Sequence, residues 1–502
     1  MPIILIIILL NLLFFHSTTV GIIFSALYFI FYGKKIGKCI FPDESKIWHI
    51  FSGIFFILSF FSLFGAIIYY FYQLNNFIIT ILLISSHFII HWIDRYSDNR
   101  LGQKCIKSTG QFSNDKKSRK STGLINILLS TAYLTILGIL FTILYKFSTT
   151  EAIRSPWHII LNYFFIFYIL ATLLLINIIL KQKSRFSLLF IMLHTFFTFS
   201  IALIIYKLGY GFDPFIHQAT EKVILQNGFI TPKPLYYLGQ YSLVVFLAKT
   251  FQSGIKNIDT FLVPVLFSVY IPSFIYLCLK SILHDSQTKL NAIKESAVKK
   301  NNSYILLATL ALLILPLSSF ISTTPQALAN IYAIIVIFLS FYVNLQPGVL
   351  NYILIFLTAT AFLIHPLTGI PLIIFLILFF ISKRKIKFKK TVITLISIIS
   401  AIALPIIFII NSLISNASKI KLQLNSITLS SIINLNIFNS ERQYNMIRDF
   451  VYLYGFNIVP IFLIISGIGI VICKISKYQE TQIPPPTPPL LRGGGREKSS
   501  HY

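Results

Sequence analysis

Acidic residues are scarce in this 502-residue sequence, which has 15 Asp and Glu against 42 Lys and Arg. Charged residues make up only 11% of the chain, whereas hydrophobic residues make up 56% and the mean hydropathy is +0.80. A soluble globular protein carries far more charge than this. The shortage of charge therefore excludes a soluble protein and indicates a chain that lies mostly in lipid.

Cysteine is also rare, and several kinds of site are excluded by what is missing. The four cysteines are Cys39, Cys105, Cys278 and Cys473, and no two have C-x-x-C spacing. This pattern supports neither a disulfide framework nor a zinc site. No glycine-rich nucleotide loop follows a strand pattern, and no Ser-His-Asp arrangement can be placed.

Long apolar runs are what the sequence has in abundance. A helix needs about 18 to 20 apolar residues to cross the ~30 Å hydrocarbon core, and the backbone there must be helical to satisfy its hydrogen bonds. About thirteen runs approach or exceed this length, which predicts an all-α polytopic membrane protein. The runs are Pro2–Tyr32, Ile47–Tyr72, Asn76–Ile93, Leu124–Phe147, Trp157–Leu180, Ser187–Leu208, Asp259–Leu279, Tyr304–Phe320, Ala327–Val343, Val349–Ile364, Gly369–Ser382, Thr391–Leu413 and Phe450–Lys474.

The first run, Pro2–Tyr32, is interrupted by the polar stretch HSTT at residues 16–19. It could form one long tilted span or a hairpin of two short helices, and we expect one span. The run has no basic segment before it and no small-residue cleavage site, so we expect it to be a retained span and not a signal peptide.

Most of the basic residues fall in alternate loops. They gather at 34–46, 95–120, 181–185, 280–300 and 383–390 and after residue 474. With the spans given above, all these loops lie on one side, which is the positive-inside pattern of a multi-pass protein of the cytoplasmic cell membrane. The distribution predicts a cytoplasmic C-terminus and contact with membrane lipid headgroups, and it argues against nucleic acid as a partner.

The loops divide the chain into three parts. Residues 1–185 are expected to form an N-terminal transmembrane unit of about five spans, with a cytoplasmic loop at 94–123. Residues 186–478 are expected to form a second transmembrane module, with large outer loops at 209–257 and 415–449. Residues 479–502 are rich in Pro and Gly and are expected to be a disordered cytoplasmic tail.

The first large outer loop opens with an acidic, helical pattern. Asp213 suits an N-cap, Pro214 the first helical position and Gly228 a stop, which predicts a helix over 214–227 that lies along the membrane surface. The spacing of four places Asp213, His217 and Glu221 on one face of this helix.

Three interpretations of this trio stay open. The first makes Asp213 a cap, His217 a solvated residue and Glu221 an ion-pair partner of a nearby lysine. The second makes the three side chains a divalent-metal site, for Mn²⁺ or Mg²⁺, with a further ligand from elsewhere. The third makes Asp213 a general base that activates an acceptor hydroxyl at the outer boundary of the membrane.

Further candidate residues lie on the same side of the membrane. The stretch TPKPLYYLGQYSLVVFLAKTF predicts a turn and then a second amphipathic helix along the membrane, with Lys233 as a ligand for lipid phosphate and Tyr237 in the aromatic belt. His365 ends a predicted span. Arg442 and Arg448, in the second outer loop, suit a phosphate because the guanidinium group binds it through two donors.

A span that ends in LGYGFDPFIHQA, followed by a surface helix, a Pro/Tyr segment and a second amphipathic helix, resembles the first outer loop of the GT-C membrane glycosyltransferases. STTPQALA at 322–329 and LIHPLTG at 363–369 also resemble short outer loops of poorly characterised bacterial-type members. The resemblance covers roughly 186–474. Pro214 and Phe215 stand where many members have a second acid, and six predicted spans precede the loop where the family usually has one.

This resemblance implies transfer of a sugar from a polyprenyl-phosphate donor to a glycan, lipid or protein acceptor at the outer face. Asp213 matches the family's acidic position after a span. The expectation is then that Asp213 is the base, that His217 and Glu221 support it or bind metal, and that Lys233, Tyr237, His365, Arg442 or Arg448 contact the donor. The alternative is a multi-span transporter or flippase, or a polymerase of lipid-linked glycans.

Overall fold

The structure is a computed structural model, and all the residues that it describes belong to one compact unit, Met1–Ile420. It describes residues 2–402 except 43, 105–122, 154, 182–185, 232, 234–235, 290–294, 315–316, 346–348, 384–390, 392–393, 396–397 and 400–401. The expected outer loop at 415–449, the expected last span and the expected tail lie outside the described residues. So do Arg442 and Arg448.

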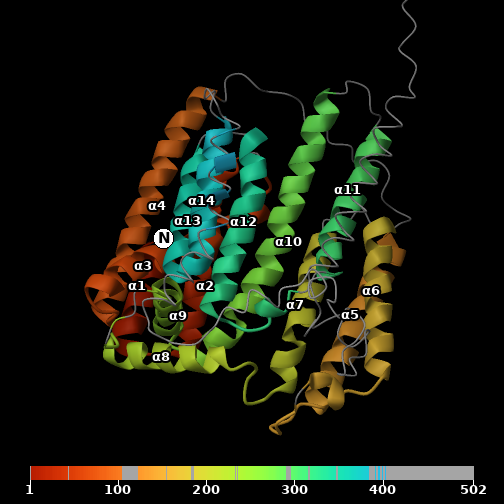
Figure 1. The fold of residues 1–502 in the computed structure, drawn as a ribbon, viewed down its shortest axis with the longest axis horizontal. Helices are drawn as coiled ribbons and strands as arrows, with labels where there is room; N and C mark the ends of the chain where they lie inside the picture. Colours follow the sequence, from red (N-terminus) through yellow and green to blue (C-terminus); the bar gives the residue numbers. More distant parts are fainter. Residues whose placement is uncertain are drawn as a thin grey trace, which may run out of the picture. The chain divides into compact units, whose positions relative to one another are not determined.

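The described residues fold almost entirely as helices (Figure 1), and they include no strand. One isolated bridge joins Thr149 to Tyr206. The elements are α1 (Pro2–Leu10), η1 (Asn11–Phe15), α2 (Thr18–Ile40), α3 (Lys46–Phe71), α4 (Asn76–Lys104), α5 (Gly123–Lys146), η2 (Pro156–His158), α6 (Tyr163–Lys181), α7 (Ser187–Ile205), α8 (Asp213–Asn227), α9 (Leu238–Phe251), α10 (Ile255–Lys289), α11 (Glu295–Leu310), η3 (Ala311–Ile314), η4 (Ser318–Phe320), α12 (Pro325–Leu345), α13 (Val349–Ile364) and α14 (Pro366–Lys383).

Nine helices in the described part of the chain are long and apolar enough to cross a membrane. They are α2, α3, α4, α5, α6, α7, α10, α12 and α14. Three shorter apolar helices, Ile3–Phe15, Asn302–Leu313 and Val349–Ile364, coincide with further expected spans. The prediction of an all-α, multi-pass membrane protein is confirmed at this level, whereas the number thirteen stays a prediction because it includes runs outside the described residues.

The expectation of a single first span is wrong, because the chain reverses at His16. The His16 backbone is left-handed, with φ 50°, and the Ser17 side chain accepts a hydrogen bond from Val20 N and caps α2. The Asn11 side chain closes the turn, since Nδ2 donates to Ser17 O at 3.0 Å and Oδ1 accepts from Ser17 N at 2.9 Å. The first apolar run is therefore two helices, and α1 packs against α2.

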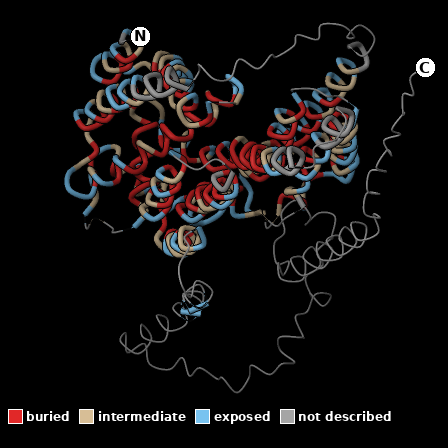
Figure 2. The backbone as a smooth tube through the Cα atoms, turned by 90° about the horizontal axis from the view of Figure 1, so that it is seen from above, coloured by how far each residue is buried: buried red, intermediate tan, exposed pale blue. Residues whose placement is uncertain are grey.

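Helices α2 and α3 approach so closely that their backbones touch through glycine. A Cβ atom on Gly53 would lie 1.8 Å from the carbonyl oxygen of Gly33, and one on Gly37 would lie 1.9 Å from that of His49. Gly33 and Gly37 have the G-x-x-x-G spacing that lets transmembrane helices pack closely. Figure 2 shows buried positions gathered in the interior, where helices such as these face one another.

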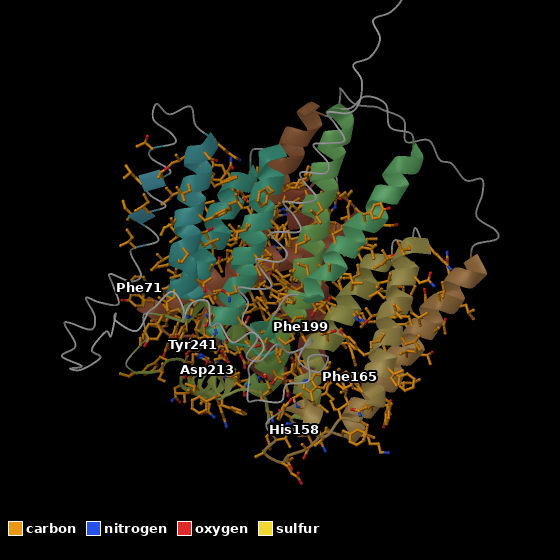
Figure 3. All side chains as sticks on the ribbon, turned by 45° about the vertical axis from the view of Figure 1, so that its right-hand side comes forward. Phe71, His158, Phe165, Phe199, Asp213 and Tyr241 are labelled. Atoms are coloured by element: carbon orange, nitrogen blue, oxygen red, sulfur yellow. The ribbon has the colours of Figure 1, made fainter. Side chains whose placement is uncertain are left out.

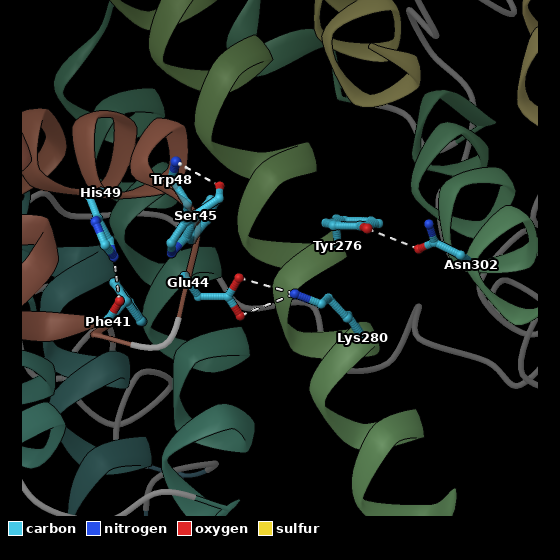
Figure 4. A network of polar contacts seen from close by, with 8 residues as sticks. All are labelled: Phe41, Glu44, Ser45, Trp48, His49, Tyr276, Lys280 and Asn302. Atoms are coloured by element: carbon cyan, nitrogen blue, oxygen red, sulfur yellow. Dashed lines mark hydrogen bonds and ion pairs between the residues drawn. The ribbon is translucent and has the colours of Figure 1, made fainter. Parts of the chain in front are cut away.

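The basic ends of α2, α4, α10 and α14 lie at one end of the bundle, the upper end in Figure 1. Two ion pairs join them: Lys35 Nζ lies 2.6 Å from Asp94 Oδ2, and Lys280 Nζ lies 3.1 Å from Glu44 Oε2. Figure 4 shows the second pair beside the bond from Tyr276 to Asn302. We refer to this end as the basic end and to the other as the α8 end.

Candidate functional site

Helix α8 lies across the ends of the bundle helices at the α8 end (Figure 1). Its boundaries follow local chemistry: Pro214 stands in the first turn, and Gly228, with φ 80°, ends the helix and donates to Ile224 O. The predicted helical segment is thus confirmed, with its start one residue earlier at Asp213, whereas its place along the membrane surface stays a prediction. The N-cap position belongs to Phe212, without a side-chain capping bond, so the expectation that Asp213 is the cap is wrong.

Asp213 is exposed and lies near His217, one turn along α8. The Asp213 carboxylate accepts no hydrogen bond from the described residues and interacts electrostatically with His217. His217 is half-buried, and its Nδ1 lies 2.9 Å from the Tyr241 hydroxyl oxygen. Burial lowers the pKa of His217, the charge of Asp213 partly opposes this, and His365 lowers the pKa further. The imidazole is therefore neutral at neutral pH.

Aromatic rings bring three distant segments together beside His217. The Tyr237 ring stacks on His365 at 5.6 Å and 11°, and it meets the His217 ring edge-on at 5.2 Å. Tyr237 has a left-handed backbone, φ 69°, a conformation that costs about 1–3 kcal/mol in a non-glycine residue and is concentrated at functional sites. We call Asp213, His217, Tyr237, Tyr241 and His365 the Asp213 cluster; Figure 3 labels Asp213 and Tyr241 at this end.

The second predicted surface helix is instead a core element. Twelve of the fourteen residues of α9 are buried. Helix α9 contacts α2, α3, α8, α10 and α13, and the Phe246 ring stacks on Phe61 at 3.7 Å. The expectation that it lies amphipathically along the membrane is wrong. The buried helix provides a rigid platform for Tyr237, at its N-cap, and for Tyr241.

Glu221 points into the bundle, away from Asp213. Its side chain is 0% exposed, and Gln240 Nε2 donates to Glu221 Oε1 at 2.9 Å. Gln240 Nε2 also lies 3.4 Å from Asp259 Oδ1, and Gln218 Nε2 donates to Asp259 Oδ2 at 2.8 Å. Burial raises the pKa of Glu221, and the negative charge of Asp259 raises it further. We call Glu221, Asp259, Gln218 and Gln240 the buried carboxyl site.

The structure therefore separates Glu221 from Asp213 and His217, with which the spacing of four had grouped it. Asp213 faces solvent, His217 lies at the boundary and Glu221 is enclosed. Among the residues that the structure describes, no three His, Cys, Asp or Glu side chains come close enough to hold a metal ion. The described geometry gives no support to the Mn²⁺ or Mg²⁺ site formed by this trio.

Sequence reasoning missed Asp259, Gln218 and Gln240. A signal for Asp259 was present, because an acid one turn inside an apolar helix is costly and usually marks a functional site. Gln240 gave no such signal, since its role depends on a contact with Glu221 that only the tertiary fold creates.

A small hollow borders the buried carboxyl site and is lined by α8, α10, the segment between α7 and α8, and residues 322–323 just before α12. Its polar lining includes Tyr210, Gln218, Lys256, Asp259 and Thr323. The free volume is about 20 Å³, which is room for about one water molecule. This volume is far too small for a sugar.

Lys233 does not lie in the Asp213 cluster. Its ammonium donates to the Tyr69 and Tyr70 carbonyl oxygens at 3.1 and 3.4 Å, and it also donates to the Tyr72 carbonyl. These carbonyls end α3, where a cation is favoured by the helix dipole. Lys233 therefore caps α3, and the described contacts do not support its expected role as a phosphate ligand.

We expect Lys233→Met to lower the free energy of unfolding by about 1–2 kcal/mol, because three carbonyls lose a charged donor. The exposed Lys222, on α8, serves as the control, and Lys222→Met should change the free energy of unfolding by less than about 0.5 kcal/mol. Denaturant titration of the two purified variants tests this. Equal stability of both variants would contradict the capping role.

Comparison with family models, with curated proteins and with solved structures gave no match for this chain.

Proposed function

We propose that the protein is an integral-membrane glycosyltransferase that transfers a sugar from a polyprenyl-phosphate donor to an acceptor at the α8 end. The observation that carries the proposal is the Asp213 cluster: an exposed carboxylate without a hydrogen-bond donor, beside a neutral imidazole and a wall of stacked rings. A general base needs these properties, namely access to the acceptor and freedom from competing partners.

The proposed reaction is a displacement at the anomeric carbon of the donor. The acceptor oxygen forms a bond to this carbon while the bond from the carbon to the phosphate oxygen breaks. The electron pair of the broken bond leaves with the polyprenyl phosphate, and Asp213 takes the acceptor's proton. The half-buried ring of Tyr237, backed by the buried His365 ring, offers a flat, partly apolar surface against which a sugar ring can be oriented. Arg442 and Arg448 remain candidates for the phosphate.

The exposed residues of α8 support a location at the membrane boundary. Phe212, Phe215 and Ile216 are 77%, 46% and 50% exposed, next to the exposed Asp213. Large apolar side chains on a helix that crosses the ends of a transmembrane bundle favour burial among lipid headgroups and the first acyl carbons. A lipid-linked donor carries its phosphate at the same depth. The donor and the proposed base would thus meet without either leaving the interface.

The test is the consumption of a panel of polyprenyl-phosphate sugars by the purified full-length protein, with and without an acceptor. We expect release of polyprenyl phosphate from at least one donor. Parallel reactions with Mn²⁺, with Mg²⁺ and with a chelator show whether a metal takes part. If correctly folded protein leaves every donor of a broad panel intact, the transferase proposal fails.

A second candidate, a transporter or flippase of lipid-linked glycans, is favoured by a different observation. Glu221 and Asp259 are both 0% exposed, and buried ionisable groups in membrane helices commonly mark ion or substrate pathways. Reconstituted vesicles discriminate the two functions. A transporter moves the intact lipid-linked glycan across the bilayer, whereas a transferase releases polyprenyl phosphate and a polymerase lengthens the glycan.

A further inference from the structure

Two carboxyl groups come together in the buried carboxyl site, and no basic side chain of the described residues pairs with either. Glu221 comes from α8 and Asp259 from α10, and both are 0% exposed. Neither group takes part in an ion pair within the described residues. Lys256 lines the hollow beside Asp259 but is itself exposed to solvent. The partners that do contact the two acids, Gln218 and Gln240, are neutral amides.

The hydrogen bonds around the pair are unequal. Asp259 receives amide donors at both oxygens, from Gln218 at Oδ2 and from Gln240 at Oδ1. Glu221 receives one, at Oε1, and its Oε2 is buried and accepts no hydrogen bond from the described residues. Asp259 thus has the surroundings of a carboxylate. The Glu221 Oε2 atom, buried and without a donor, has the surroundings of an oxygen that carries a proton.

Two negative charges cannot both persist in this place. Burial of one unpaired carboxylate is already costly, and two in contact repel each other strongly where water is excluded. A proton on one of them removes a charge and also supplies a short, strong hydrogen bond to the other. We propose that Glu221 and Asp259 form a proton-binding site, in which one proton held between the two carboxyl groups fastens α8 to α10.

A proton fits the site better than a metal cation does. The Gln240 amide directs its N–H donors toward both carboxyl groups, at 2.9 and 3.4 Å. A sodium or other hard cation requires oxygen ligands around it, and an N–H group at that position opposes one. Gln240 Oε1 is buried without a partner, on the side of the amide that faces away from these donors.

The neighbouring ionisable groups supply no charge that would displace the proton from Glu221 and Asp259. His217, on α8, is kept neutral by burial, which lowers its pKa. Tyr241, on α9, stays a neutral phenol because burial raises its pKa. Lys256, on α10, faces the solvent side of the hollow, and Tyr69, on α3, lies beside Tyr241. This proposal is independent of the transferase proposal, because it concerns how α8 is held and not what the Asp213 cluster does.

Infrared spectroscopy of the full-length protein in detergent tests the site, because a protonated carboxylic acid has a C=O stretch distinct from that of a carboxylate. We expect such a band at neutral pH, with a shift in D₂O, and we expect Glu221→Gln to abolish it. Asp259→Asn should shift the band without abolishing it, since Glu221 then donates to an amide. Glu151→Gln, at an exposed acid, is the control and should leave the band unchanged.

Thermal unfolding of the same proteins provides a second readout. The pKa of Glu221 is raised in the folded protein above its ordinary value of 4.5, so the folded state binds the extra proton. Stability from this proton is complete below pH 4.5 and is lost as the pH rises through the folded pKa. We expect the unfolding temperature of the wild type to fall over this window and that of Glu221→Gln to fall less.

Three results would overturn the proposal. The first is the absence of the band in the wild type at neutral pH. The second is a band that survives Glu221→Gln, which would place the proton elsewhere. The third is a band that appears only when sodium is replaced by choline, which would make the site a cation site. If Glu221→Gln fails to fold, the shifted band of Asp259→Asn decides the same question.

Discussion

Replacement of Asp213 by asparagine is expected to lower the rate of sugar transfer by about 10²- to 10⁴-fold, the range that a positioned general base contributes. Asparagine has the same shape as aspartate but cannot take the acceptor's proton. The free energy of unfolding should change by less than about 0.5 kcal/mol, because Asp213 is exposed and its side chain makes no capping bond. The loss should appear in kcat more than in KM, since the base acts in the transition state.

The measurement is the initial rate of polyprenyl phosphate release by the wild type and the variant at matched protein concentration. Glu151→Gln is the matched control, because Glu151 is an exposed acid in the loop between α5 and α6 and lies outside the Asp213 cluster. This control should retain the full rate. Equal rates for Asp213→Asn and the wild type would remove Asp213 from the chemistry and leave the transferase without its proposed base.

The largest effect on stability is expected for Gly53→Ala. The new methyl group would start 1.8 Å from the Gly33 carbonyl oxygen and 2.7 Å from the Gly33 Cα, and both contacts are with backbone atoms that cannot rotate away. Helices α2 and α3 must therefore move apart along a long and well-packed interface. We expect a loss of about 3 kcal/mol, at the upper end of what overpacking costs.

Gly138→Ala is the same substitution at a position where we expect it to raise the free energy of unfolding. Gly138 lies on an exposed face of α5, and a Cβ atom there would meet nothing within 4 Å. Alanine is the better helix former, so this variant should gain about 0.5–1 kcal/mol. Denaturant titration in detergent measures both changes. A Gly53→Ala protein as stable as Gly138→Ala would show that the α2–α3 contact is not close in solution.

The elements that the sequence predicted well are those with local causes. Helix α8 begins and ends where Pro214 and Gly228 require it. The sequence predicted one continuous span through His16, whereas the structure has a turn there. A single polar stretch in an apolar run does not reveal the hydrogen bonds between Asn11 and Ser17 that close this turn. Nothing local distinguishes a bent span from a reversal, and the choice depends on how α1 packs against its neighbours.

Helix α9 was misjudged because its polar residues were taken to face water. Three of them have partners within the protein instead: Ser242 donates to the Ser62 carbonyl at 2.9 Å, Gln240 donates to Glu221, and Lys249 donates to Asn76 at 2.8 Å. Polar residues that bond to partners inside the protein and polar residues that face water produce the same pattern in a sequence. Contacts with distant helices decide between them.

The candidate site was predictable only in part, for a geometric reason. A step of four residues turns the side chain by about 40° around a helix, so two steps turn it by about 80°. That rotation is enough to carry the trio from exposed Asp213, through half-buried His217, to enclosed Glu221. The side chains that complete each half, Tyr237 with His365 and Gln240 with Asp259, come from segments far along the chain.

The reversal at His16 leaves an apolar helix at the edge of the protein that is shorter than the hydrocarbon core is thick. The apolar helix before the turn, Ile3–Phe15, has 13 residues and at 1.5 Å each spans about 20 Å, short of the ~30 Å hydrocarbon core. Ile3, Phe14 and Phe15 on it are 65%, 69% and 66% exposed. For this helix to cross the bilayer, the lipids beside it would have to compress or tilt, at a fraction of a kcal/mol per Å. Vesicles made from shorter acyl chains relieve that mismatch, so bilayer thickness becomes a variable of any reconstituted assay.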